Sequence, residues 1–409
     1  MVVAPLVIVL AVTLLLLSPL LFLLSLLLPS RYGRRRAMRL VWFAVVWAIM
    51  EAMALVACLG LWVASGFGGR IRSQAYQERH YALMGWFLER IFRIATRVFD
   101  LRVDIDEPEP TPAELRARLA RPVIVLSRHA GPGDSFLLVH HLLNRYHRRP
   151  RIVMKAALQL DPSIDVVINR LPHAFVRPRR VGPPDGEDAS AGENAAAGEN
   201  AAAGEDAAES AGASGSRDSM ARESKSREST ARESMVVGEI RRLAAGLDND
   251  GALVIFPEGG NFTRTRWRLG IQRLEQRRRY ADAWRARRMT NLLPPRSGGV
   301  TAALQAAPDA DVIFVAHTGL DNLVTVADVW RGLPMETVIK ARWWRVVAAD
   351  VPRTHEALVP WLFDWWERID AWIAHQRVVP DDDLPRYTEL PRDTELPCDT
   401  DLPRDTELA

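Results

Sequence analysis

The stretch VIVLSRHAGPGDSF, at residues 123–136, decides the fold of this chain. It opens with four apolar, mostly β-branched residues, which predict a buried strand. The strand runs into a turn rich in glycine and proline that carries His129 and Asp134, and residues 135–144 are predicted to form a helix capped by Ser135. A histidine at a strand end can face an aspartate at the start of the next helix. The carboxylate would then hold one imidazole nitrogen and leave the other free to take a proton from an alcohol.

A second stretch, ALVIFPEGGNF at residues 252–262, has the same layout. Its first five residues predict another buried strand, which runs into a turn with Glu258, Gly259 and Gly260. We expect this turn to lie at the same end of a sheet as His129. The backbone N–H groups of the two glycine-rich turns are then candidates for stabilising an oxyanion.

The two motifs in this order carry more information than either does alone, because the chain has 9 histidines and a chance His-x4-Asp is common. The pair resembles the HxxxxD and FPEG motifs that the glycerolipid acyltransferase family carries on neighbouring strands. Glu258 follows His129 by 129 positions, and by 76 when the 53 low-complexity residues 183–235 are left out. Both motifs therefore fall within one compact domain, which we place at residues 100–378.

Later blocks of the sequence resemble one branch of that family. LLPPRSGG at residues 292–299 and the Trp-rich block at 339–373 are similar to the lysocardiolipin acyltransferase branch, which includes 1-acylglycerol-3-phosphate acyltransferases. The likeness covers residues 100–182 and 236–378, together with the hydrophobic N-terminus. It implies an α/β acyltransferase domain with a mixed sheet flanked by helices, preceded by N-terminal membrane helices.

The resemblance also implies a reaction. An acyl chain would move from acyl-CoA, or from an acyl-carrier protein, to the free hydroxyl of a lysophospholipid, with 1-acyl-sn-glycerol-3-phosphate as the first candidate and phosphatidic acid as the product. His129 would act as the general base and Asp134 would orient it. The mechanism requires no metal and no other cofactor, and no acyl-enzyme is expected because no serine or cysteine is flanked by a base.

The substrate-binding residues implied by the resemblance are of two kinds. Glu258, with Gly259 and Gly260, is expected to position the glycerol or head group of the acceptor. The candidate contacts to a phosphate are Lys155, Arg177, Arg264, Arg266 and Arg296.

The chain departs from the family pattern at two places. Arg128 stands where the family commonly has Asn, and Gly260-Asn261 stands where Thr-Arg follows FPEG. We therefore expect Arg264 or Arg266 to replace the missing arginine. Two alternatives stay open: an enzyme that remodels lysocardiolipin or another lysophospholipid, and a catalytically degenerate membrane protein that binds lipid.

Composition restricts the class of protein. The 409 residues carry a formal charge of +3 with a pI near 9.0, and 48% are hydrophobic, which suffices for one sizeable core plus membrane segments. No zinc-finger or RNA-recognition pattern is present, so nucleic acid is not an expected partner. The two cysteines, Cys58 and Cys398, exclude a cysteine-based metal site and favour a reducing, cytoplasmic active site.

The N-terminal part predicts attachment to the cell membrane, with the catalytic domain on the cytoplasmic side. Residues 1–30 have no charged side chain and are long enough to span a bilayer, and the arginines that follow belong on the cytoplasmic side. A second hydrophobic segment, residues 40–69, contains Glu51. A full crossing would carry the domain away from acyl-CoA, so we expect a re-entrant or in-plane segment; a hairpin embedded in one leaflet is the alternative.

Three further segments have distinct patterns. Residues 80–99 predict an amphipathic helix with arginines at helical spacing, which lies either on the membrane interface or on the core of the domain. Residues 183–235 and 379–409 are repetitive and poor in aromatic and branched apolar residues, so we expect a disordered insertion and a disordered tail.

The rest of the domain is predicted from local patterns. A strongly basic helix follows the second motif, and the Trp-rich helix 355–376 is expected to pack in the core. The remaining expected strands are 101–107, 151–154, 174–177 and 311–319, and the remaining expected helices are 165–170 and 235–247.

Overall fold

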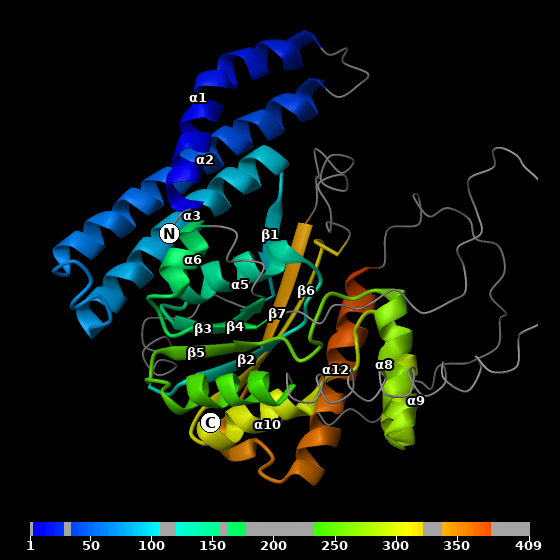
Figure 1. The fold of residues 1–409 in the computed structure, drawn as a ribbon. Helices are drawn as coiled ribbons and strands as arrows, with labels where there is room; N and C mark the ends of the chain where they lie inside the picture. The colour runs from blue at the N-terminus through cyan, green and yellow to red at the C-terminus, as the bar shows by residue number, and fades with distance from the viewer. Residues whose placement is uncertain are drawn as a thin grey trace, which may run out of the picture. The chain divides into compact units, whose positions relative to one another are not determined.

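The computed structural model describes residues 3–27, 34–106, 120–155, 162–176, 233–321 and 338–377 (Figure 1). The predicted insertion at 183–235, apart from its last three residues, and the predicted tail at 379–409 lie outside these ranges. The two motifs and nearly all of the predicted strands and helices around them lie inside.

The centre of the fold is a seven-stranded sheet with the order β1-β7-β6-β2-β5-β3-β4. The strands are β1 (Arg102–Ile105), β2 (Val123–Ser127), β3 (Arg149–Lys155), β4 (Ala174–Val176), β5 (Gly251–Ile255), β6 (Asp311–Thr318) and β7 (Val338–Val346). Neighbouring strands are parallel except β6 and β7, which are antiparallel. The predicted mixed sheet is therefore confirmed.

Helices cover both faces of this sheet (Figure 1). They are α1 (Val3–Leu27), α2 (Arg34–Ala64), α3 (Gln74–Phe99), α5 (Pro132–Asn144), α6 (Pro162–Ile168), α8 (Arg264–Gln276), α9 (Tyr280–Arg288), α10 (Ser297–Ala306) and α12 (His355–Gln376), with a further helix at 233–245. Side chains alternate along each central strand, so one set packs with α2, α3 and α5, and the other with α8, α9, α10 and α12. The layers match the predicted α/β class.

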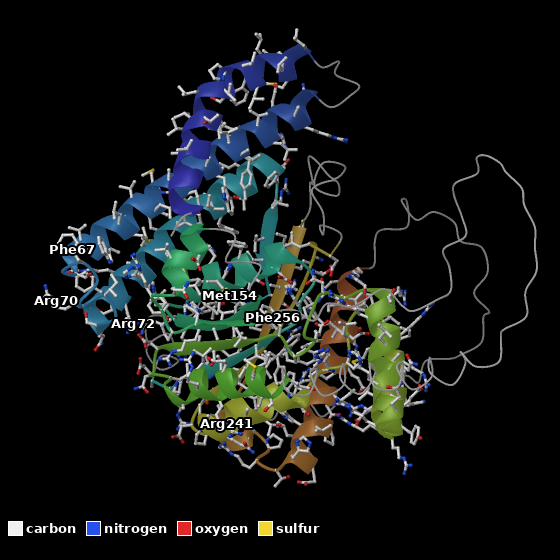
Figure 2. All side chains as sticks on the ribbon, viewed as in Figure 1. Phe67, Arg70, Arg72, Met154, Arg241 and Phe256 are labelled. Atoms are coloured by element: carbon white, nitrogen blue, oxygen red, sulfur yellow. The ribbon has the colours of Figure 1, made fainter. Side chains whose placement is uncertain are left out.

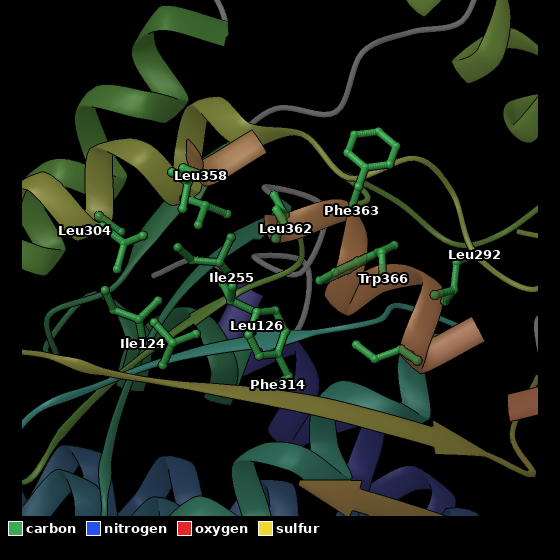
Figure 3. Close-up of a cluster of buried hydrophobic side chains, with 14 of the residues drawn as sticks. Ile124, Leu126, Ile255, Leu292, Leu304, Phe314, Leu358, Leu362, Phe363 and Trp366 are labelled. Atoms are coloured by element: carbon green, nitrogen blue, oxygen red, sulfur yellow. The ribbon is translucent and has the colours of Figure 1, made fainter. Parts of the chain in front are cut away.

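Aromatic side chains from α12 fill the larger of these two cores (Figure 3). Phe314 of β6 is fully buried and stacks on Trp365, with ring centroids 4.4 Å apart. Trp361 and Trp366 meet the same phenylalanine edge-on. The Trp-rich helix therefore packs in the core, as its sequence predicts.

The second hydrophobic segment belongs to the domain as well as to the N-terminal region. Helix α2 packs along α1 on one side and along α3 on the other, and its Met50 and Ala54 join the buried cluster beneath β2 and β5. The helix begins at Arg34 rather than at residue 40. Among the described residues it is the one helix that is long and apolar enough to cross a membrane, a weak criterion that the core helix of a soluble protein also meets.

Helix α3 adopts the packed arrangement that the sequence left as one of two alternatives. One face is buried against α2 and α5 and includes Tyr81, Phe87 and Ile91. The arginines at helical spacing, Arg90 and Arg93 among them, are exposed on the other face.

The helices that follow the two motifs differ from the prediction. The basic segment after the second motif is not one helix but two, α8 and α9, because Arg278 between them has a φ of +56° that no helix continues through. Helix α5 begins at Pro132, so Ser135 lies inside its first turn and does not cap it. Asp134 takes that role, since its carboxylate accepts the N–H of Gly131, the residue that precedes the helix.

Candidate active site

Three parallel strands bring the polar residues of the site to the same level. Leu126 of β2 is paired with Ile255 of β5 and with Phe314 of β6. Three residues beyond each of these, at the carboxyl ends of the strands, stand His129, Glu258 and His317. The expectation that Glu258 lies at the same end of the sheet as His129 is confirmed, and a second histidine joins them.

The turn between β2 and α5 holds His129 against Asp134. Imidazole Nδ1 of His129 lies 3.2 Å from each carboxylate oxygen of Asp134. The same carboxylate accepts hydrogen bonds from the backbone N–H groups of Ala130, at 2.6 Å, and Gly131, at 3.0 Å. These contacts fix both partners, and they leave Nε2 as the imidazole atom that can take up a proton.

The charge of the pair follows from its surroundings. The Asp134 side chain is almost fully buried, whereas that of His129 is 13% exposed. Burial alone would raise the pKa of Asp134. The hydrogen bond from His129, and the charges of His317 and His129 when these are protonated, outweigh burial and lower this pKa to about 2. Asp134 is therefore a carboxylate at neutral pH and favours the positive charge that His129 gains when it accepts a proton.

Glu258 holds the backbone of the site. Its buried carboxylate accepts the N–H of His129 through one oxygen and the N–H of Leu293 through the other, each at 3.1 Å. Burial raises its pKa to about 7, in spite of the positive charge of Arg128 and these two hydrogen bonds. The structure therefore shows Glu258 fixing the position of His129, and its predicted contact with an acceptor stays a prediction.

Two of the candidate phosphate contacts, Arg266 and Arg296, lie against the glycine turn that follows β5. Gly259 has a φ of +70°, and a Cβ there would lie 3.1 Å from the Arg296 guanidinium carbon. A Cβ on Gly260 would lie 2.8 Å from Nη1 of Arg266, which also donates to the carbonyl of Asn261. Both arginines are exposed. Two guanidinium groups therefore flank the turn that carries Glu258.

The other candidate cations are less well placed or are not described. Arg264 is the exposed first residue of α8, and no contact joins it to the turn among the described residues. Lys155 is the last residue of β3, and its side chain is not among those described. Arg177 lies outside the described residues.

Sequence reasoning missed a largely buried polar cluster of Arg128, His317 and Asp321, which adjoins Asp134 through His317. Arg128, predicted only as a departure from a family pattern, is 1% exposed and pairs with Asp321 at 2.5 Å. It also donates to the carbonyl of His317 at 2.7 Å. The signal for His317 was its place at the end of a buried strand, which is the same place that drew attention to His129.

The comparison with protein families decides the class of this protein. A family model described as Acyltransferase matches residues 102–318, more than half of the 409 residues. The chain belongs to the acyltransferase family. No curated protein and no solved structure matches the chain.

The acyltransferase match runs from β1 to the end of β6. It therefore includes His129, Asp134, Glu258 and both arginines of the glycine turn. The superfamily given by the sequence resemblance and the general activity of acyl transfer are confirmed by this match.

Proposed function

We propose that this acyltransferase is membrane-bound and moves an acyl chain from acyl-CoA to the free hydroxyl of 1-acyl-sn-glycerol-3-phosphate, which gives phosphatidic acid. The observation that carries the proposal is the His129–Asp134 pair, in which Nδ1 faces a buried carboxylate and Nε2 has no hydrogen-bond partner among the described residues. This arrangement suits a general base that acts on an alcohol.

The reaction is a direct transfer. His129 Nε2 takes the proton of the acceptor hydroxyl, the oxygen attacks the thioester carbonyl, and the C–S bond breaks as the tetrahedral intermediate collapses. The proton held by His129 then passes to the departing thiolate. Asp134 stabilises the imidazolium that exists between the two proton transfers.

The backbone groups that stabilise the oxyanion are fewer than the sequence suggested. The N–H of Gly131 donates to Asp134, and the N–H of Gly259 donates to the carbonyl of Phe256. Phe256 in turn packs its ring against that of His129, with centroids 4.7 Å apart. The Gly260 N–H, which has no such bond among the described residues, and the two arginines beside it are the better candidates.

The acceptor is tested by acyl transfer from labelled oleoyl-CoA with the full-length protein in membranes. Lysophosphatidic acid and lysocardiolipin are offered separately, and oleoyl-acyl-carrier protein is tested as a rival donor. Labelled phosphatidic acid is the expected product. Transfer to lysocardiolipin alone would replace the proposal with phospholipid remodelling, and transfer to neither acceptor would support a lipid-binding protein without activity.

The two arginines of the glycine turn are expected to bind the acceptor phosphate. Replacing Arg266 or Arg296 with alanine should raise KM for lysophosphatidic acid about 10- to 150-fold, the loss of about 1.5–3 kcal/mol that a hydrogen bond to a charged group contributes. The kcat should change much less, because the phosphate is remote from the reacting hydroxyl. Arg241→Ala, at an exposed arginine of helix 233–245, is the matched control. Unchanged KM in both variants would remove these residues from the acceptor site.

The membrane contact is proposed from the outer face of α2. Its exposed apolar side chains recur at helical spacing along the helix; they are Trp42, Ile49, Met53, Val56, Leu59, Val63 and, just beyond the helix, Phe67. The exposed Arg70 and Arg72 follow at the same end (Figure 2). Apolar residues beside arginines are typical of a surface that enters the headgroup region of a bilayer.

The packing of α2 favours an in-plane position over a crossing. Arg39 near its start donates to the carbonyl of Val98 in α3, at 3.1 Å, and Arg170 donates to the carbonyl of Cys58 near its end, at 2.8 Å. The helix is thus tied to the catalytic domain along its length. A helix that crosses a bilayer would have to pull the domain in with it, whereas a helix lying in one leaflet keeps its contacts with α1 and α3 and places its exposed apolar side chains in lipid.

Fluorescent labels at three positions along α2 test this orientation, because the depth of each label in the bilayer can be measured. A fluorophore is attached to single cysteines at Trp42, Met53 or Val63, with Cys58 and Cys398 replaced by serine, and quenching by lipids that carry a shallow or a deep quencher is measured. Residues 42 and 63 are about 32 Å apart along the helix, close to the thickness of the hydrocarbon core. An in-plane helix gives the same shallow depth at all three positions. A deep label at 53 between two shallow ends would show a crossing.

The control for the depth experiment is Met235→Cys. Met235 is an exposed apolar residue on helix 233–245, which is not part of the proposed membrane face. It should not be quenched. Equal quenching at 235 and at the three positions in α2 would contradict a membrane face confined to the N-terminal helices.

A further inference from the structure

The second histidine of the site has no part in the proposed transfer. His317 is the last residue but one of β6, the strand on the opposite side of β2 from Glu258, and its side chain is 6% exposed. It cannot take the place of His129, whose imidazole reaches toward solvent. Its position beside the buried carboxylate of Asp134 calls for another explanation.

Asp134 lies between two imidazoles. Oδ2 of Asp134 is 3.2 Å from Nδ1 of His129 and 3.6 Å from Nε2 of His317. The same Nε2 atom lies 3.3 Å from the carbonyl oxygen of Arg128. Because both neighbours of Nε2 are oxygen atoms, the proton of a neutral His317 belongs on Nε2.

Burial and the charge of Arg128 keep His317 neutral. Burial, followed by the positive charge of Arg128, lowers the pKa of His317 below its ordinary value, in spite of the carboxylates of Asp134 and Asp321. Arg128 is itself paired with Asp321 and donates to the backbone carbonyl of His317. The arginine thus anchors the end of β6 to the end of β2, and its charge is balanced within the same cluster.

We propose that His317 is a positioning residue: its Nε2–H, held by the Arg128–Asp321 pair, orients the Asp134 carboxylate toward His129. This inference rests on the proposed role of His129 as the base. Oδ1 of Asp134 accepts the hydroxyl of Ser135 at 3.2 Å, and Oδ2 accepts the N–H groups of Ala130 and Gly131. The Nε2–H of His317 approaches Oδ2 at 3.6 Å, an electrostatic contact longer than a hydrogen bond, and adds a restraint from a neighbouring strand. Arg128 thereby holds His317 in place without contacting the substrate.

The first test compares two substitutions of His317. His317→Leu removes the N–H and keeps most of the volume, whereas His317→Gln keeps an amide N–H within reach of Asp134. His317→Leu should lower kcat about 10- to 100-fold with KM unchanged, and His317→Gln should retain most of the activity. Phe314→Leu, in the same strand, loses core packing but no contact with Asp134, and it controls for a general loss of stability.

A double variant separates positioning from mere packing. If His317 acts through Asp134, then His317→Leu should cost little further activity in a chain that already carries Asp134→Asn. Losses that multiply in the double variant, or a loss in His317→Leu no larger than that in Phe314→Leu at equal thermal destabilisation, would overturn the proposal.

A readout independent of acyl transfer keeps the two proposals apart. Diethyl pyrocarbonate modifies neutral imidazole, and mass spectrometry of the peptide that contains His129 gives the rate at that residue. The rate should fall in His317→Leu and in Asp134→Asn, and should stay near wild type in His317→Gln. If the protein shows this pattern of rates but no acyltransferase activity, the proposed function is wrong and the positioning role stands. If all variants are modified at equal rates, the positioning role is wrong.

Discussion

Replacement of His129 by alanine is expected to lower kcat for acyl transfer by about 10²–10⁴-fold, the contribution of a general base placed next to its substrate. This corresponds to about 2.7–5.5 kcal/mol in the activation free energy. The KM values should change little, because the imidazole acts on the reacting hydroxyl and the acceptor phosphate is expected to bind at the glycine turn.

The measurement is a steady-state assay with the purified full-length protein in detergent micelles. His355→Ala, at an exposed histidine in the first turn of α12, is the matched control and should keep wild-type activity. A melting temperature near that of the wild type shows that His129→Ala has folded. A folded His129→Ala protein with wild-type kcat would exclude this histidine as the base.

The second large effect concerns the core beneath the site. Trp366→Ala should lower the free energy of unfolding by about 3–5 kcal/mol, the range for removing a large aromatic side chain from a close-packed interior. Trp366 is fully buried among Phe314, Leu362 and other residues of the larger core (Figure 3). Denaturant unfolding followed by circular dichroism gives the difference.

A second tryptophan offers the comparison that this stability measurement needs. Trp284 on α9 is 56% exposed and contacts the guanidinium of Arg288 across its ring face. Trp284→Ala should therefore change the stability by less than about 1 kcal/mol. Similar losses for the two substitutions would show that α12 does not form the core in solution as it does here.

Local sequence patterns predicted the strands and the pair at the heart of the site. The apolar runs at residues 123–126 and 252–255 form strands because their side chains favour burial, and the turn residues that follow mark where the strands end. His129 meets Asp134 because a turn followed by a helix start leaves little freedom over five residues. Short-range geometry can therefore be predicted from the sequence, and the fold class follows from it.

Features that depend on distant partners were beyond such reasoning. Arg128 is buried because Asp321, 193 positions later, neutralises it, and His317 acquires its place from the pairing of β6 with β2. The break at Arg278 gave no signal, since arginine is a good helix former. For Arg128 and His317 the deciding contact is set by tertiary packing and leaves no trace in the neighbouring residues.

The pairing of β1 with β7 also sets an order of events during synthesis. Arg102 is paired with Val338, 236 positions later. At about 5–20 residues per second, a ribosome needs roughly 12–47 s to supply that partner. In that interval the hydrophobic α1 and α2 have already emerged, while the sheet still lacks the strand that joins β1 to it. Under the proposed membrane attachment, α1 and α2 would therefore meet the bilayer before the sheet of the catalytic domain is complete.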